Sequence, residues 1–325
     1  MLNSAKLLTK NNSIRFDLTT AAEFALVTLI WGSTWLVIKG QLGVVPPAWS
    51  VAYRFVLAAT LLTGFTVATG RWQWPTRAGH AFALVVGTTQ FALNFNLVYA
   101  AENRLASGIV ALVFALLVVP NTILAAVFLK TPISLRFSGG ATLSVVGLIL
   151  LFAPDLAGPH GSDALVGVAL LVGAIMAASI GNVLQAGRFG RSLPPLPALA
   201  LAMTYGAVIN VIFAVATIGG PRLDPRAEYW LGLAYLSVAA SVVAFSVYYR
   251  LIRRIGPGPA AYSSVLVPVI AMSLSTVFER YRWTPTAGAG AILALIGLLV
   301  AVGGRRMTVN KGTHVALPGN RQTLG

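Results

Sequence analysis

The stretch ASGIVALVFALLVVPNTILAAVFLK, residues 106–130, decides the fold class of this chain. It contains no charged residue before Lys130, so its apolar run exceeds the about 20 residues that an α-helix needs to cross the hydrocarbon of a bilayer. Pro120 lies near its middle, where a proline removes a backbone donor and bends a helix. The stretch therefore predicts a kinked transmembrane helix.

The composition extends this prediction to the whole chain. Of the 325 residues, 57% are hydrophobic and 10% are charged, against about 25% charged in ordinary soluble domains. A soluble fold has too little core to bury so much apolar surface, so the sequence predicts a polytopic membrane protein. The chain has no Cys and three His, so thiol catalysis is excluded, and neither a metal site nor a cofactor is expected.

Ten apolar runs are long enough to cross a bilayer. They cover residues 21–39, 47–69, 80–101, 106–129, 135–153, 164–187, 195–218, 229–250, 258–278 and 285–304. Short linkers with Gly, Pro and Arg separate them. The predicted fold class is an all-α integral membrane protein with ten transmembrane helices.

The net charge of +15 comes mostly from Lys and Arg in the short loops. With the N-terminus inside the cell, sixteen of the 23 Lys and Arg residues lie on the cytoplasmic side and six on the other, and Arg54 lies within a span. This asymmetry predicts that both termini are cytoplasmic. Because the positive charge is distributed as in a membrane protein, nucleic acid is not expected as a partner, and the lipid bilayer is.

The two halves of the chain share a pattern of Pro and Gly. When Pro120 is placed over Pro268, and two extra residues are assigned to the second loop, Gly140 pairs with Gly290 and Gly147 with Gly297. Five spans per half is an odd number, so the second half must enter the membrane from the opposite side. The sequence predicts two inverted five-helix repeats, residues 21–153 and 164–304, between cytoplasmic tails at 1–20 and 305–325. The alternative is a chance match of small residues.

Short motifs follow one another in order along the first, second, fourth and ninth spans. They are Trp31-Gly32-Ser33-Thr34-Trp35, Pro46-Pro47, Arg54-Phe55, Ala106-Ser107-Gly108 with Phe128-Leu129-Lys130, and Gly256-Pro257-Gly258-Pro259-Ala260 with Phe278-Glu279. Together they resemble the EamA-type permeases of the drug/metabolite transporter superfamily. The resemblance implies a ten-helix carrier with a central cavity between helices 1–4 and 6–9. It also implies export of amino acids or other small metabolites, with proton coupling in some members.

The chain departs from that family pattern at two places. Thr131 replaces the acidic residue that often follows the fourth helix, whereas Glu279 is retained in the second half. Ala177 and Ala178 stand where the sixth helix often has a Trp. The first departure argues against equivalent roles for an acidic residue in both loops. The second predicts a less aromatic wall on that side of the cavity.

Arg54 is the one charged residue well inside a span, and an intramembrane charge is a functional hypothesis by default. It would hold a substrate carboxylate, or else stabilise the structure by capping carbonyls or by snorkelling. Trp31 and Trp35 share one face of the first span, where they form either core packing or a cavity wall.

Further polar residues lie on the third, sixth and ninth spans. Gln90 and Asn94 share a helix face, and buried amides need partners, which are either neighbouring helices or a wet cavity. Asn182 on the sixth span and Tyr262 near a Gly-Pro break complete the predicted substrate site. Pro120 and Pro268 at matched positions suggest hinges for alternating access, with static bends as the alternative.

No carboxylate lies deep in a span, so the usual intramembrane proton relay is not evident. Proton coupling would need Glu23, Glu102, Glu279 or His80, which all lie near span edges. These residues are more often anchors than sites.

The sequence therefore predicts a multi-pass carrier of the inner cell membrane that exports small metabolites, most of all amino acids, by alternating access. Uncoupled exchange of a nucleoside, sugar or organic anion is the alternative. An integral-membrane enzyme is disfavoured, because its catalytic acids and histidines would cluster. Glycines in the fifth and tenth spans allow close helix contact, either inside the chain or in a homodimer.

Overall fold

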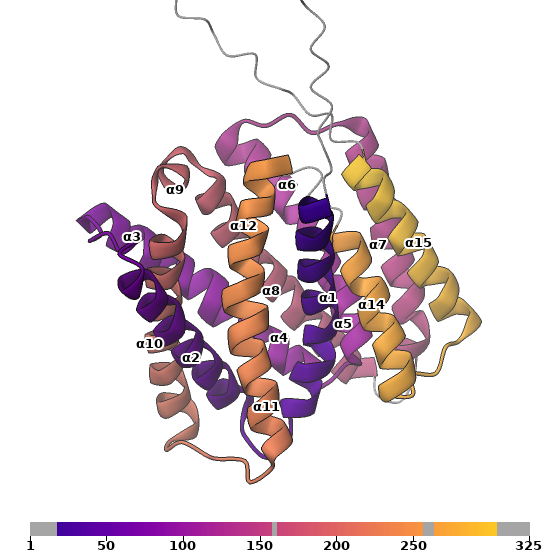
Figure 1. Cartoon of the computed structure of the whole chain (residues 1–325). Helices are drawn as coiled ribbons and strands as arrows, with labels where there is room; N and C mark the ends of the chain where they lie inside the picture. The colour runs from indigo at the N-terminus through magenta and orange to yellow at the C-terminus, as the bar shows by residue number, and fades with distance from the viewer. Residues whose placement is uncertain (1–17, 158–160, 256–262, 304–325) are drawn as a thin grey trace, which may run out of the picture.

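The computed structural model describes residues 18–157, 161–255 and 263–303, and within these ranges every regular element is a helix (Figure 1). The helices are α1 (Leu18–Gln41), α2 (Pro47–Ala68), α3 (Arg77–Val86), η1 (Gly87–Leu93), α4 (Asn94–Glu102), α5 (Ser107–Phe114), η2 (Ala115–Leu117), α6 (Val118–Leu129), α7 (Leu135–Ala157), α8 (Gly161–Ala186), α9 (Arg188–Ser192), α10 (Pro195–Ile218), α11 (Ala227–Tyr235), η3 (Leu236–Val243), α12 (Ala244–Ile255), α14 (Ser263–Phe278) and α15 (Pro285–Gly303).

Nine helical runs in the described ranges are long and apolar enough to cross a membrane, and α14 is a shorter apolar helix. Three of the nine are composite, because α3, η1 and α4 form one span, as do α5, η2 and α6, and α11, η3 and α12. The predicted ninth span began at residue 258, and its first residues lie outside the described ranges. The all-α membrane fold with ten helices is confirmed.

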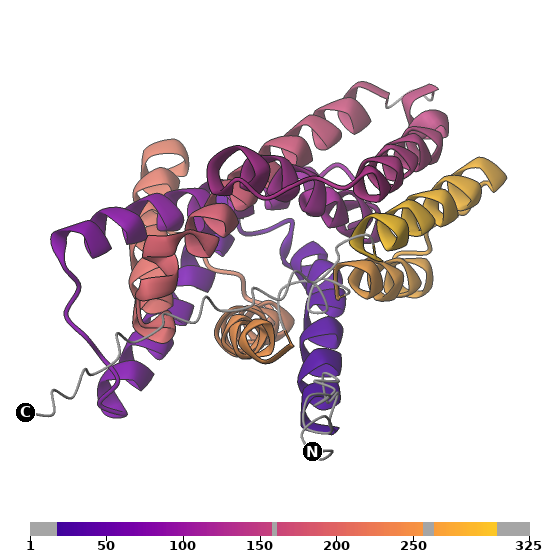
Figure 2. The same ribbon diagram turned by 90° about the horizontal axis from the view of Figure 1, so that it is seen from above.

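The helices pack in a pattern that relates the two halves. The helix α7 lies along α15, and α2 lies along α10, and Figures 1 and 2 show these two pairs on opposite sides of the molecule. The contact of α1 with α14 is matched by that of α8 with α6, and the contact of α10 with η1 by that of α2 with η3. Each contact recurs with the roles of the halves exchanged, as an inverted repeat requires.

Two π-helical segments, η1 and η3, occupy equivalent places in the third and eighth spans. A π-turn widens the helix and frees backbone carbonyls, and such turns are frequent at functional sites. Each segment here gives a carbonyl to a side chain from another span. Asn210 Nδ2 donates to Phe91 O at 3.0 Å, and Trp31 Nε1 donates to Ala240 O at 3.3 Å. Nothing in the hydrophobic pattern of the sequence predicted these segments.

The glycines of the fifth and tenth spans make contact within the chain. A Cβ atom on Gly140 would lie 2.6 Å from Gly297 O, and one on Gly297 would lie 2.6 Å from Gly140 O. Gly139, by contrast, has nothing within 4 Å of such an atom. The close approach is therefore used to join α7 to α15, and a homodimer stays a separate prediction.

Two residues with a left-handed backbone end the fourth and ninth spans. They are Lys130 (φ 57°) and Arg280 (φ 54°), the non-glycine residues with positive φ in the described ranges. Each precedes the next helix by the same number of residues, because α7 begins at Leu135 and α15 at Pro285. The loop between α14 and α15 is one residue longer than the loop between α6 and α7, not two as expected. The other extra residue lies in the helix, between Pro268 and Phe278.

The two matched prolines have different surroundings. Pro120 follows the 3₁₀ turn η2, where its missing N–H would have bonded to Leu116. Pro268 lies within α14, which is α-helical on both sides of it in the described residues. Of the two prolines, only Pro120 thus lies next to an interruption of the α-helix in the described residues. The hinge role of both prolines remains a prediction.

Candidate substrate site

Trp31 connects the first span to the eighth. Its indole is half-buried and packs against Phe245, at 5.4 Å between ring centroids, and against Tyr248, at 4.9 Å. Its Nε1–H donates to the carbonyl of Ala240 inside η3. The ring thereby lies between spans of the two repeats, which is where a carrier that works by inverted repeats binds its substrate.

Arg54 is buried, with 1% of its surface exposed. Its Nε donates to Ser241 Oγ at 3.1 Å, and its guanidinium lies over the rings of Phe95 at 4.5 Å and Phe55 at 5.4 Å. Its Nη1 has no hydrogen-bond partner in the structure. Cation–π contacts and one hydrogen bond therefore hold the charge in place and leave one donor free.

A chain of aromatic rings joins Arg54 to Trp31. Phe95 contacts Phe55 at 4.8 Å, Phe55 contacts Phe91 at 5.4 Å, and Phe91 contacts Phe245 at 5.8 Å. The sequence analysis did not place Phe91, Phe95 or Phe245 in the site. A signal was available for two of them, because Phe91 and Phe95 are one turn apart and next to the two predicted amides.

Gln90 and Asn94 lie together on the third span, as their spacing suggested. Both are buried, and Asn94 Nδ2 donates to the carbonyl of Gln90 at 3.2 Å. The oxygens Gln90 Oε1 and Asn94 Oδ1 have no partner. Gly181 on α8 leaves the space that Gln90 fills, since a Cβ atom at Gly181 would lie 2.8 Å from Gln90 Oε1.

The other predicted site residues have more varied surroundings. Trp35 is buried against Phe114 at 5.2 Å, and its Nε1 has no partner. Asn182 donates to Asn121 Oδ1 at 3.4 Å, which ties α8 to α6. Tyr262 lies outside the described residues. The described contacts thus bring Trp31 and Arg54 into one aromatic chain, and they place Gln90 and Asn94 on the neighbouring face of the third span.

Glu102 was predicted near a span edge, and it lies there as the last residue of α4, with its side chain fully buried. The helices α1, α2, α5 and α8 all pack against α4, so they exclude water from the helix end. At the opposite end, Glu23 lies 3.9 Å from Arg250 and His80 lies 2.9 Å from Tyr205. Within the described ranges, no cluster of acidic or histidine side chains is suited to a metal ion.

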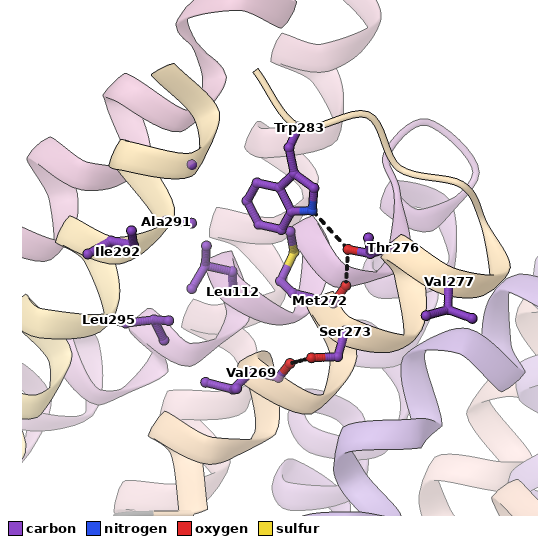
Figure 3. A pocket seen from close by; sticks show the side chains of 11 residues that line it. Leu112, Val269, Met272, Ser273, Thr276, Val277, Trp283, Ala291, Ile292 and Leu295 are labelled. Atoms are coloured by element: carbon purple, nitrogen blue, oxygen red, sulfur yellow. Dashed lines mark hydrogen bonds between the residues drawn. The ribbon is translucent and has the colours of Figure 1, made fainter. Parts of the chain in front are cut away.

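A groove of about 600 Å³ lies elsewhere, between α14, α15 and α5 (Figure 3). Its polar groups are occupied locally, since Trp283 Nε1 donates to Thr276 Oγ1 at 2.9 Å and Ser273 Oγ to Val269 O at 2.8 Å. Ile292 and Val277 on its rim are 62% and 70% exposed. The apolar lining and open rim suit lipid chains rather than a polar solute.

Comparison with known proteins identifies the fold and the family. The model of the EamA-like transporter family matches residues 21–153 and 165–303. A solved crystal structure with 17% sequence identity has a TM-score of 0.64, covers 87% of this chain and 96% of its own, and so shares the fold.

Relatives of similar length are known in enterobacteria. A "Probable amino-acid metabolite efflux pump" of Escherichia coli (strain K12) is 26% identical over 293 residues, which is 86% of this chain and 94% of the relative. The "Uncharacterized inner membrane transporter YedA" of the same strain is 30% identical over 260 residues, or 78% of this chain and 81% of the relative. These matches indicate a transporter rather than an enzyme. The chain belongs to the EamA-like transporter family, within the drug/metabolite transporter superfamily.

Proposed function

We propose that this protein exports amino acids, or closely related zwitterionic metabolites, across the inner cell membrane by alternating access. The substrate would bind between the two repeats, near Trp31, Arg54, Gln90 and Asn94. Both termini would lie in the cytoplasm, as the distribution of Lys and Arg favours.

The observation that carries the proposal is a set of four buried polar atoms without partners. Two are donors, Arg54 Nη1 and Trp35 Nε1, and two are acceptors, Gln90 Oε1 and Asn94 Oδ1. Buried polar groups in native proteins are nearly always hydrogen-bonded, so unsatisfied ones call for an explanation. A zwitterion supplies the missing partners, because its carboxylate accepts from Arg54 and its ammonium group donates to the amide oxygens.

The aromatic chain supports the same function. Phe91, Phe245 and Trp31 provide an apolar surface beside the polar atoms, which is typical of small-molecule sites. The name of the Escherichia coli relative, which describes amino-acid metabolite efflux, agrees with this substrate class.

A second candidate function is uncoupled exchange of a small organic anion. Among the described residues Arg54 forms no salt bridge. Its charge can therefore attract the carboxylate of a substrate that has no ammonium group. The two candidates differ in what Gln90 and Asn94 do, because an anion has no use for two acceptors.

Counterflow in proteoliposomes tests the proposal. Vesicles are loaded with an unlabelled amino acid, and uptake of the labelled compound is compared with that of the matching amino-acid amide and of the deaminated acid. We expect counterflow of the free amino acid, and little of the two analogues. Gln90→Leu should abolish it, whereas Gln73→Leu, the same change at an exposed loop position, should not.

Two results would contradict the amino-acid assignment. Equal counterflow of the deaminated acid would favour the organic-anion carrier. Full activity of Gln90→Leu would remove this residue from the site.

A further inference from the structure

One end of the helix bundle is closed by a buried hydrogen-bond network. This far end, at the bottom of Figure 1, is where α1 ends at Gln41 and α11 begins. Tyr99 donates to Gln41 Oε1 at 3.0 Å, Gln41 Nε2 contacts Tyr229 O at 3.4 Å, and Tyr229 shares a hydrogen bond with Ser50 at 2.8 Å. All four side chains are buried. The network joins α1 to α4, α11 and α2.

Lys39 makes a second set of hydrogen bonds at the same end. Its ammonium group donates to the backbone carbonyls of Glu102 and Leu105, the second at 3.0 Å. Glu102 is the last residue of α4 and Leu105 follows three residues later. Carbonyls at the end of a helix lack intrahelical partners and attract positive charge. The contact depends on the end of α1 lying directly against the end of α4.

The carboxyl group of Glu102 is buried beneath this contact and has no partner. Its exposed fraction is 0%, and neither Oε1 nor Oε2 has a hydrogen bond. Glu279 provides the contrast, since its carboxylate accepts bonds from the backbone N–H of Ser107, at 3.1 Å, and from the hydroxyl of the same residue. Glu102 and Glu279 both lie at this end, and of the two only Glu279 has hydrogen-bond donors that stabilise an ionised carboxylate.

The charged neighbours of Glu102 form neither a hydrogen bond nor a salt bridge with its carboxyl group. Its charged and titratable neighbours are Lys39 from α1, Arg54 from α2, Tyr99 from its own span, and Glu279 after α14. Neither cation hydrogen-bonds to the carboxyl group in the structure, because the ammonium group of Lys39 donates to backbone carbonyls and Arg54 Nε donates to Ser241 Oγ. The segments α5 and η1 carry no charged residue, and α8 carries only the exposed Asp163. An ionised carboxylate buried without a hydrogen bond is so costly that such groups hold a proton instead.

We propose that Glu102 is a proton-binding site that is filled when the far end is closed and emptied when it opens. The proposal rests on the alternating access put forward above, in which the end of α1 must leave α4. That movement brings water to Glu102 and lets the carboxyl group ionise. Closing the far end again then requires the carboxylate to take up a proton from the far side.

This arrangement makes the far end sensitive to pH in a defined direction. Acid on the far side favours closure, because the closed form holds one proton more than the open form. Rising pH favours opening, since the hydrated carboxylate then stays ionised. Glu102 takes up its proton from the far side of the membrane when that end closes and releases it to the same side when that end opens. The site therefore needs no net proton movement across the membrane.

Dipolar EPR spectroscopy tests the proposal on the full-length chain in lipid nanodiscs. The chain has no cysteine, so Gly40→Cys and Asn103→Cys introduce one label beside Lys39 and one beside Glu102. Both positions are exposed, and a Cβ atom at Gly40 would meet nothing within 4 Å. The label-to-label distance is measured over a pH series with Glu102 present, with Glu102→Gln, and with Glu228→Gln as a control at an exposed carboxylate of the same end.

We expect a short distance at acid pH and a growing population at longer distance as the pH rises. Glu102→Gln, which mimics the protonated side chain, should keep the short distance at every pH, and Glu228→Gln should behave like the parent. The proposal is overturned if the parent shows no pH dependence, or if Glu102→Gln retains it. Should Glu102→Gln not fold, Glu102→Met serves as a second neutral variant with the same expected result. The measurement uses no substrate, so its result does not depend on whether the protein transports amino acids. A failure of this proposal can therefore be told apart from a failure of the proposed function.

Discussion

A Cβ atom on Gly147 would lie 2.7 Å from the carbonyl oxygen of Gly290, and a Cβ atom on Gly290 would lie 2.6 Å from that of Gly147. The two glycines come from equivalent spans of the two repeats and let the backbones of α7 and α15 touch. In a bilayer, where apolar surface gives no driving force between helices, such close packing is one of the attractions that hold helices together.

Gly147→Ala should therefore destabilise the protein. The added methyl group has only backbone atoms around it, so the helices must separate, at a cost of about 1–3 kcal/mol as for other overpacked sites. Thermal unfolding in detergent measures the effect. Gly139→Ala is the matched control on the same helix, because nothing lies within 4 Å of the added atom. A similar loss of stability in both variants would show that the glycine contact is unimportant.

Asn210 and Gln90 are both buried amides, and we expect opposite outcomes when they are replaced. Asn210 accepts from Asn96 Nδ2 at 2.7 Å and donates to Phe91 O at 3.0 Å, so Asn210→Leu removes two hydrogen bonds, although Asn96 Nδ2 keeps its bond to Ala92 O at 2.9 Å. It should lower stability by about 1–2 kcal/mol, because it removes two hydrogen bonds between membrane helices, each worth about 0.6 kcal/mol on average.

Gln90→Leu should lower transport and leave the unfolding temperature nearly unchanged. Its Oε1 has no partner to lose, and removing an unsatisfied buried polar group costs little. Unfolding curves and counterflow of both variants, measured on the same preparations, separate structural from substrate-binding amides. A stable, inactive Asn210→Leu would reverse this assignment.

Arg54→Lys tests what the guanidinium does beyond carrying charge. Lysine keeps the charge but cannot donate to Ser241 and to a ligand in the same plane, nor stack flat over Phe95. We expect KM for free amino acids to rise about tenfold, since a hydrogen bond to a charged group is worth about 1.5–3 kcal/mol. The low residual counterflow of the amino-acid amide should change much less. Equal changes for acids and amides would mean that Arg54 only supports the structure.

The loop before α11 should respond to pH through Asp224. Hydrogen bonds from the Arg226 side chain hold the pKa of Asp224 below its usual value, and the backbone N–H of Arg226 adds a bond of 2.9 Å. Because this pKa is lowered, the stabilisation is complete at neutral pH and is lost as the pH falls below the usual carboxyl range. Asp224→Asn should lose it at every pH.

The indole signal of Trp230 provides the readout for this loop, because its Nε1 donates to Asp224 O at 2.9 Å. NMR of ¹⁵N-tryptophan protein, with the signal assigned from Trp230→Phe, should show a shift at acid pH in the parent. In Asp224→Asn the shift should be present already at neutral pH. A signal that does not move in either case would separate the loop from the titration of Asp224.

The membrane fold was predictable from the chain because the relevant property is local. Whether a run such as residues 106–129 is long enough to cross a bilayer depends on its own residues, and so does its content of charge. The matched glycines, Gly140 with Gly290 and Gly147 with Gly297, made the repeat visible for a related reason, since only glycine fits where two backbones touch. Gln90 and Asn94 were placed on one face by spacing alone, and their contact follows from it.

What the tertiary structure decided is the environment of each side chain. The sequence placed Glu102 near a span edge, but its complete burial became visible only with the four helices that pack against α4. Arg54 was visible as an intramembrane charge, whereas its partner Ser241 comes from the other repeat. The π-turns η1 and η3 were likewise not predictable, because their carbonyls bond to side chains of distant spans. Hydropathy and spacing are properties of one helix, but burial and hydrogen bonding depend on which helices lie beside it.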